Sequence, residues 1–202
     1  MRHVHLNRVT PTDLHNASAM IVTTRDPVDR VISAFNWRHP RFGSSPKRFQ
    51  PFGRECDREQ AQAEENVYKC FDTVNDFARS LDDHTWCGLV ARTTLQHGVG
   101  HIGRGFSWYL AQSLPLILNS TVTRRLHLTH VETLQEDVAA VARSFTIRGD
   151  VSLQFYHKQM QVQSMFPNST VDRHGREMLQ RVLADDYYIL SQLERRVASD
   201  DF

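Results

Sequence analysis

The chain has 202 residues and a mass of 23.4 kDa, a size that a single hydrophobic core commonly serves. Its composition of 40% hydrophobic, 9% aromatic and 23% charged residues is close to the globular average and excludes a disordered, collagen-like or disulfide-dense chain. At this length we expect a single domain over residues 1–202. Because the formal net charge is only +1, we expect no nucleic-acid partner, and any anion site must be local.

Two short strands and a helix are predicted near the start of the chain. Residues 3–6 and 19–24 have strand character, and the second run is typical of a strand buried on both faces. Asp26 then occupies an N-cap position, and Pro27 the first position of a helix. The apolar side chains of this helix recur at a spacing that places them in one stripe on the sheet: Val28, Val31, Ile32 and Phe35.

The middle of the chain is predicted to be a loop followed by helices. Residues 38–58 contain several Pro and Gly residues and form the most basic stretch of the chain. This stretch either guides an acidic glycan or is an ordinary solvated loop. Helices are expected over residues 58–81 and 85–96, ahead of a glycine-spaced stretch at residues 100–105.

The last third of the chain repeats the order of strand and helix. Residues 125–128 predict a strand, and Thr129 and Glu132 have the spacing of a capping box that opens the next helix. A final helix is predicted over residues 172–197. Strands that alternate with helices indicate a helix-rich α/β fold in which helices flank a parallel sheet.

A candidate anion site follows the strand at residues 19–24. In parallel α/β folds, ligands bind beyond the carboxyl ends of the strands, where helix N-termini offer free N–H groups. Arg25 stands at such an end with a bidentate donor, and Ser33 on the following helix has a hydroxyl group. The alternative is structural: Arg25 pairs with Asp26 or Asp29, and Ser33 only packs within the helix.

The segment from Ile21 to Phe35 resembles the 3′-phosphate-binding motif of the sulfotransferases that use 3′-phosphoadenosine 5′-phosphosulfate. The matching residues are Arg25, Asp26, Pro27, Arg30 and Ser33. In that family, the residues that match Arg25 and Ser33 hold the 3′-phosphate of the donor, and we assign Arg30 to the same site. Weaker similarity favours the Golgi-type, carbohydrate-directed branch, at Cys70-Phe71, residues 126–137 and Asp186-Tyr187.

The resemblance implies a P-loop NTPase-like sulfotransferase fold and a transferase that moves a sulfuryl group from this donor to a hydroxyl group of a carbohydrate, without a metal. It also implies the Golgi lumen or the secretory pathway, with membrane attachment only through an anchor outside this chain. A non-catalytic relative that binds a nucleotide or a glycan is the alternative. A small kinase is disfavoured, because the phosphate-binding sequence GxxxxGK[ST] does not occur.

Members of that family carry a loop for the 5′-phosphosulfate upstream of the 3′-phosphate motif. Only 24 residues precede Arg25 here, and none resembles that loop. We therefore expect an N-terminally truncated fold, either a fragment or a degenerate relative. On this expectation the chain alone binds the nucleotide product but transfers little or no sulfuryl group, since losing one transition-state donor costs about a hundredfold or more.

Sulfuryl transfer also requires a base that takes the proton of the acceptor hydroxyl. His5, preferred to His3, stands where some family members have their proposed base, and both side chains face one side of the predicted strand. The alternatives are two solvated imidazoles or a metal-binding pair. Glu132 is the other candidate base, unless it serves the capping box.

The cysteines and the sequons bear on the cellular compartment. An odd number of cysteines without a CxxC argues against a structural zinc site. In an oxidising compartment we expect Cys70 and Cys87 to pair and Cys56 to stay free, whereas in the cytosol all three are buried thiols. Three asparagines stand in N-x-[ST] glycosylation sequons: Asn16, Asn119 and Asn168.

Overall fold

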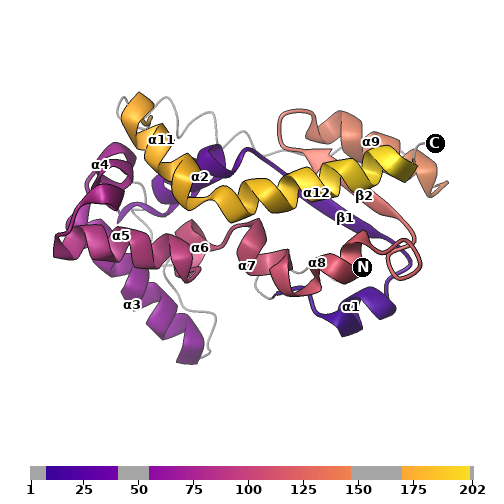
Figure 1. The fold of residues 1–202 in the computed structure, drawn as a ribbon, viewed down its shortest axis with the longest axis horizontal. Helices are drawn as coiled ribbons and strands as arrows, with labels where there is room; N and C mark the ends of the chain where they lie inside the picture. The colour runs from indigo at the N-terminus through magenta and orange to yellow at the C-terminus, as the bar shows by residue number, and fades with distance from the viewer. Residues whose placement is uncertain (1–7, 41–54, 147–169, 201–202) are drawn as a thin grey trace. The chain divides into compact units, whose positions relative to one another are not determined.

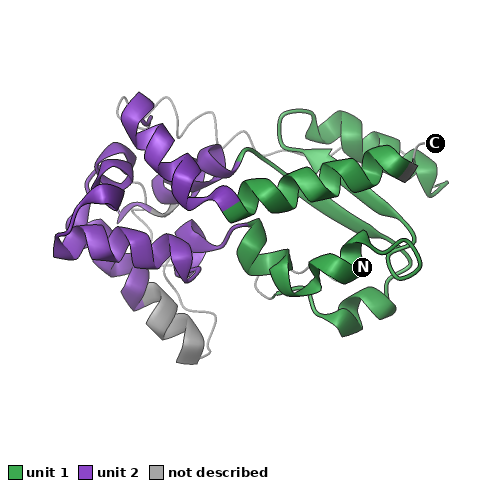
Figure 2. Cartoon of the chain, viewed as in Figure 1, with its two compact units in different colours: residues 1–26, 106–155, 185–202 green, residues 27–105, 156–184 purple. Residues whose placement is uncertain are grey.

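The structure of the chain is a computed structural model, which describes residues 8–40, 55–146 and 170–200 (Figure 1). These residues form two compact units, which Figure 2 colours separately. Unit 1 contains residues 8–26, 106–146 and 185–200, and unit 2 contains residues 27–40, 55–105 and 170–184. The chain passes between the units several times, and the expectation of a single domain over residues 1–202 stays a prediction.

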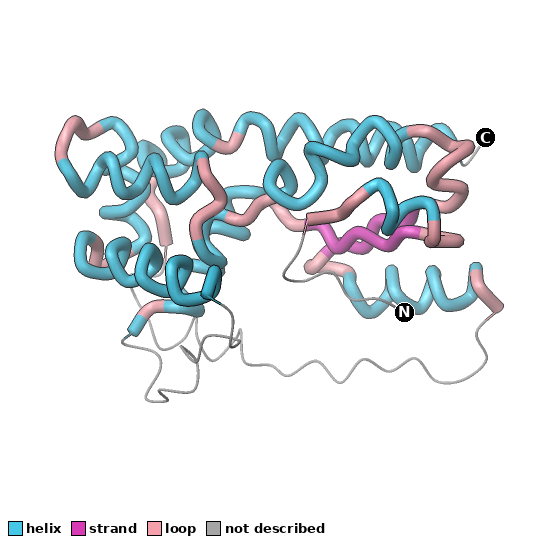
Figure 3. The backbone as a smooth tube through the Cα atoms, turned by 90° about the horizontal axis from the view of Figure 1, so that it is seen from below, coloured by secondary structure: helices cyan, strands magenta, loops and turns pink. Residues whose placement is uncertain are grey.

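Unit 1 combines a two-stranded sheet with helices (Figure 3). The strands β1 (Met20–Thr24) and β2 (Leu126–His130) pair in parallel, with Met20 opposite Leu126 and Thr24 opposite His130. The helices are α1 (Pro11–His15), α7 (Phe106–Leu110), the 3-10 helix η4 (Ala111–Ser113), α8 (Leu114–Leu118), α9 (Leu134–Ser144) and α12 (Ala184–Asp200), whose first residue belongs to unit 2. The helix-rich α/β class and the parallel pairing are therefore confirmed, whereas the P-loop sulfotransferase fold stays a prediction.

Strand β1 is buried on one face only, which corrects the prediction that both of its faces are covered. Val22 and Thr24 are buried, whereas Ile21 is 42% exposed and Thr23 is also exposed. Because side chains alternate along a strand, this pattern places one face against the core of unit 1. That core gathers Val9, Leu14, Val22, Phe106, Leu110, Ile117, Leu126, Ile189 and Leu193.

All the secondary-structure elements of unit 2 in the described ranges are helices. Its elements are α2 (Pro27–Arg38), α3 (Glu55–Cys70), α4 (Val74–Arg79), the 3-10 helix η3 (Ser80–Asp82), α5 (Trp86–Gln96), α6 (Gly100–Gly103) and α11 (Arg173–Val182). Helix α2 begins at Pro27, as predicted, and the side chains of Val28, Val31 and Phe35 are fully buried. Within the unit this stripe packs against helices where a sheet was predicted, since α2 contacts α4, α6 and α11.

Two predicted helices are each split in two. The helix predicted over residues 58–81 is α3 followed by α4, because the Thr73 hydroxyl accepts the N–H of Asp76 at 3.1 Å and starts a new helix there. The helix predicted over residues 172–197 is α11 followed by α12, and the break lies at Leu183. The helix predicted over residues 85–96 is confirmed as α5.

The capping box predicted at Thr129 and Glu132 is wrong. Thr129 lies inside β2, where it is fully buried and its hydroxyl donates to the hydroxyl oxygen of Thr23 at 3.0 Å. Helix α9 begins later, at Leu134. The β-branched Thr129 is therefore used as a strand residue, and Glu132 has no capping role.

A disulfide joins the sulfur atoms of Cys70, at the end of α3, and Cys87, in the first turn of α5. The two Cα atoms are 5.5 Å apart and the cysteines are 17 residues apart in sequence. The bridge closes the stretch that contains α4 and η3, and it joins the cysteines that the sequence analysis paired.

Candidate anion-binding site

The candidate site lies at the carboxyl end of the sheet in unit 1. Thr24 and His130 are the last paired residues of β1 and β2, so both strands end at the same edge. The backbone N–H of Val131 donates to the carbonyl oxygen of Thr24 at 3.0 Å and extends the pairing by one bond. This bond fixes the backbone immediately before Arg25, which is the first residue after β1. The edge is the one at which parallel sheets bind their ligands.

Arg25 is half-buried at this edge. It makes no hydrogen bond or ion pair with any residue that the structure describes, and its Nε atom is buried without an acceptor. A buried donor without an acceptor costs free energy, and a charged donor costs more than a neutral one. Arg25 therefore has the capacity to take an anion from outside the chain.

The acidic neighbours of Arg25 are engaged elsewhere. The Asp26 carboxylate accepts the hydroxyl hydrogen of Tyr187 at 2.8 Å, within unit 1. The Asp29 carboxylate pairs with the guanidinium of Arg176 at 2.5 Å, within unit 2. The structural alternative in which Arg25 pairs with Asp26 or Asp29 is therefore wrong, because tertiary partners hold both carboxylates.

Arg30 and Ser33 belong to α2 in unit 2, on the other side of the unit boundary from Arg25. The Arg30 guanidinium donates to the backbone carbonyl oxygens of His101 at 3.3 Å and Ile102 at 2.9 Å. These bonds give Arg30 a structural role in holding α6, in addition to the anion-binding role that the resemblance assigns to it. Ser33 is half-buried on α2.

At the same sheet edge, His130 at the end of β2 is hydrogen-bonded to Asp137 of α9. The Oδ2 atom of Asp137 accepts the backbone N–H of His130 at 2.7 Å and the hydroxyl of Thr133 at 2.9 Å, and it lies 3.0 Å from Nδ1 of His130. The His130 backbone bond, followed by the bond to its ring, lowers the pKa of Asp137 below its ordinary value. In the sequence, residues 126–137 stand out only through the resemblance, and no local pattern predicts this pair.

Replacing Asp137 with Asn is expected to destabilise the protein at neutral pH and to have no such effect in strong acid. Because the native pKa is lowered, the contribution of Asp137 is present above its unfolded pKa, near 4, and disappears as the pH falls through the native value. Denaturant unfolding of the wild type and of Asp137→Asn between pH 7 and pH 2 measures this difference. Glu136→Gln, at the exposed neighbouring residue, serves as the control. A difference in the free energy of unfolding between the wild type and Asp137→Asn that stays constant with pH would contradict the electrostatic cause.

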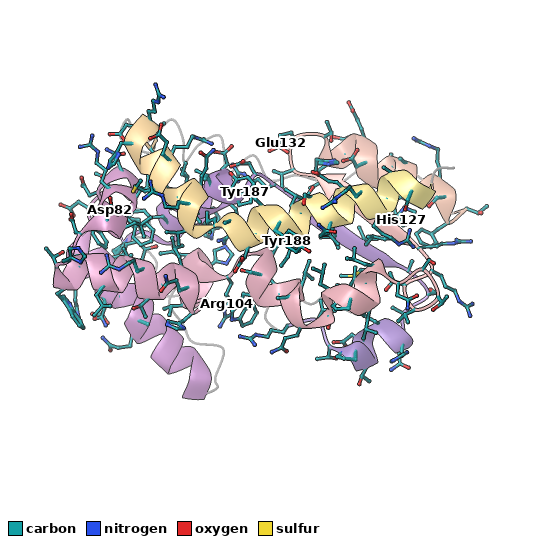
Figure 4. All side chains as sticks on the ribbon, viewed as in Figure 1. Asp82, Arg104, His127, Glu132, Tyr187 and Tyr188 are labelled. Carbon is teal, nitrogen blue, oxygen red and sulfur yellow. A yellow bond between two sulfur atoms is a disulfide. The ribbon has the colours of Figure 1, made fainter. Side chains whose placement is uncertain are left out.

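The other predicted site residues are placed as follows. His3, His5 and Asn168 lie outside the described residues. Glu132 is exposed in the turn between β2 and α9, and its carboxylate has no partner among the described residues (Figure 4). Asn16 is the C-cap residue after α1 and Asn119 the C-cap residue after α8, and both are exposed.

The glycine-spaced stretch at residues 100–105 follows helix α5, whereas a phosphate-binding loop of the P-loop kind follows a strand. Gly100 has a φ of +59°, and a Cβ there would collide with the side chain of Glu64. The buried Glu64 carboxylate accepts the backbone N–H of His101, which follows Gly100. Both observations give this stretch a packing role in unit 2.

Searches against known proteins add no relative: no family model, no curated protein and no solved structure matches the chain. Within the described ranges, no cluster of three or more His, Cys, Asp or Glu side chains is arranged to hold a metal ion. In the same part of the chain, no helix is both long enough and apolar enough to span a lipid bilayer. The geometry of the sheet edge is therefore the basis for a functional proposal.

Proposed function

We propose that the chain is a carbohydrate sulfotransferase that uses 3′-phosphoadenosine 5′-phosphosulfate, and that Arg25 holds the 3′-phosphate of this donor. The observation that carries the proposal is the Arg25 guanidinium, which has no partner among the described residues and whose Nε is buried without an acceptor at the carboxyl end of β1. The twelve-residue helix α2 starts two residues later, at Pro27, within the stretch that resembles the 3′-phosphate motif.

The resemblance of residues 21–35 to the 3′-phosphate motif supplies the identity of the anion. In the proposed reaction, the acceptor hydroxyl oxygen bonds to sulfur, the bond between sulfur and the donor phosphate breaks, and a base takes the hydroxyl proton. His5, ahead of His3, stays the proposed base. Ser33 is assigned to the phosphate by the resemblance alone, and Arg30 combines that assignment with its bonds to α6.

Two observations support maturation in the Golgi lumen or elsewhere in the secretory pathway. Disulfides persist in oxidising compartments, and the structure contains one between Cys70 and Cys87. Both sequon asparagines in the described part of the chain, Asn16 and Asn119, are exposed and thus accessible to glycosylation. The carbohydrate acceptor, and a membrane anchor outside this chain, are proposed from the resemblance to the Golgi-type branch.

A comparison of two nucleotides tests the proposal. We expect adenosine 3′,5′-bisphosphate to bind at least about tenfold more tightly than adenosine 5′-phosphate, since one charge-assisted contact to the 3′-phosphate is worth about 1.5 kcal/mol or more. Isothermal calorimetry at one fixed ionic strength measures both affinities. Equal affinities would refute recognition of the 3′-phosphate and would favour the kinase-like alternative.

Transfer of labelled sulfur from the donor to a glycan separates the proposed enzyme from the non-catalytic alternative, provided that it is measured on the chain joined to an upstream loop for the 5′-phosphosulfate, because the chain alone is expected to transfer little or no sulfuryl group. The enzyme transfers the label, whereas a relative that only binds the nucleotide retains the donor unchanged. The two outcomes are measured on glycan that has been separated from free donor, so that bound nucleotide does not count as product.

A further inference from the structure

The acidic neighbour of Arg25 poses an electrostatic problem for anion binding. Asp26 follows Arg25 directly in sequence, and a neighbouring carboxylate that turns toward the guanidinium competes with an external anion for it. In the structure this competition is avoided, because Asp26 accepts a hydrogen bond from Tyr187 at 2.8 Å. The two residues are separated by 161 positions in sequence but lie in the same unit.

Tyr187 comes from a firmly anchored part of α12. The preceding residue, Asp186, is only 2% exposed and accepts the backbone N–H of Ser107 at 2.7 Å. Ile189, two residues later, is 3% exposed and belongs to the core of unit 1. The backbone on both sides of Tyr187 is thus fixed, so its hydroxyl is delivered to Asp26 by a rigid element.

We propose that Tyr187 is a positioning residue of the anion site: its hydroxyl holds the Asp26 carboxylate and thereby leaves the Arg25 guanidinium available to the phosphate of a nucleotide. The inference rests on the proposed function and assigns a role to a residue that does not itself touch the ligand. Its physical basis is the hydrogen bond from Tyr187 to Asp26 at this edge, together with an Arg25 side chain that has no partner among the described residues.

Replacing Tyr187 with Phe tests this role, because the substitution keeps the ring and removes only the hydroxyl group. Asp26 then becomes available to Arg25, and we expect the affinity for adenosine 3′,5′-bisphosphate to fall by roughly threefold to fivefold, the strength of a partly exposed ion pair. Tyr188→Phe is the matched control, since Tyr188 is the next residue on α12 and is 58% exposed (Figure 4). This control is expected to bind like the wild type.

The second arm of the experiment uses Asp26→Asn, which removes the competing charge and retains a side chain suited to the N-cap position. In this background, Tyr187→Phe is expected to cause no further loss of affinity, because no carboxylate remains to be held. A purely structural role of Tyr187 would instead give the same loss in both backgrounds and would overturn the inference. Wild-type affinity in Tyr187→Phe alone would also overturn it.

The result for the wild type separates this inference from the function on which it rests. If the wild-type protein does not bind adenosine 3′,5′-bisphosphate, the proposed function fails, and the site that Tyr187 would position fails with it. If the wild type binds but Tyr187→Phe does not lower the affinity in the wild-type background alone, only the role of Tyr187 fails. Thermal unfolding of each variant confirms that the compared proteins are folded.

Discussion

Replacing Arg25 with Ala should weaken the binding of adenosine 3′,5′-bisphosphate by between about tenfold and 150-fold. This range corresponds to roughly 1.5–3 kcal/mol, the usual contribution of a hydrogen bond to a charged group. The reason is that the Arg25 guanidinium makes no bond to the described residues, so its whole donor capacity is available to the ligand. Calorimetric titration of the wild type and the variant measures the loss.

Two further variants show whether the effect belongs to this side chain. Arg25→Lys keeps the charge but loses the planar fork, so its affinity should lie between those of the wild type and Arg25→Ala. Arg124→Ala removes an exposed arginine of the same unit near the opposite end of β2 and should bind normally. Unchanged affinity in Arg25→Ala would refute the assignment of Arg25 to the phosphate.

Removing the disulfide should lower the free energy of unfolding by about 3 kcal/mol, the value that loop entropy gives for a bridge across about fifteen residues. The bridge between Cys70 and Cys87 spans 17 positions, and its loss gives the unfolded chain the conformational entropy that the closed loop had removed. The double variant Cys70→Ala, Cys87→Ala is compared with the wild type by denaturant unfolding under non-reducing conditions. The midpoint should shift to lower denaturant.

Cys56 is predicted to stay free, and its substitution provides the control for the disulfide experiment. The stability of Cys56→Ser should stay close to that of the wild type. Adding a reductant to the wild type should reproduce the loss seen in the double variant and should leave the double variant unchanged. Equal stability of the oxidised wild type and the double variant would contradict a stabilising bridge.

Local patterns predicted those parts of the fold that depend on neighbouring residues. The strand at residues 19–24 and the helix start at Pro27 follow from an apolar run and from a residue with fixed φ, and both are present. The break before α4 also had a local signal, since Thr73 and Asp76 have the spacing of an N-cap with an acidic first turn. The break at Leu183 follows no such pattern.

Other features depend on contacts between distant segments, which a single sequence does not display. Thr129 and Glu132 matched a capping box, yet the pairing of β2 with β1 places Thr129 inside a buried strand, and this tertiary environment overrides the local preference. Likewise, the sequence left open whether Asp26 pairs with Arg25. The answer depends on Tyr187, which the fold brings from 161 positions away.

Phosphorus NMR of bound adenosine 3′,5′-bisphosphate tests the central claim most directly, because the 3′- and 5′-phosphates of the ligand give separate resonances. Addition of the wild-type protein should shift and broaden the 3′-phosphate resonance more than the 5′-phosphate resonance, and Arg25→Ala should remove this preference. A perturbation confined to the 5′-phosphate, or an equal response of the wild type and Arg25→Ala, would contradict the binding of the 3′-phosphate by Arg25.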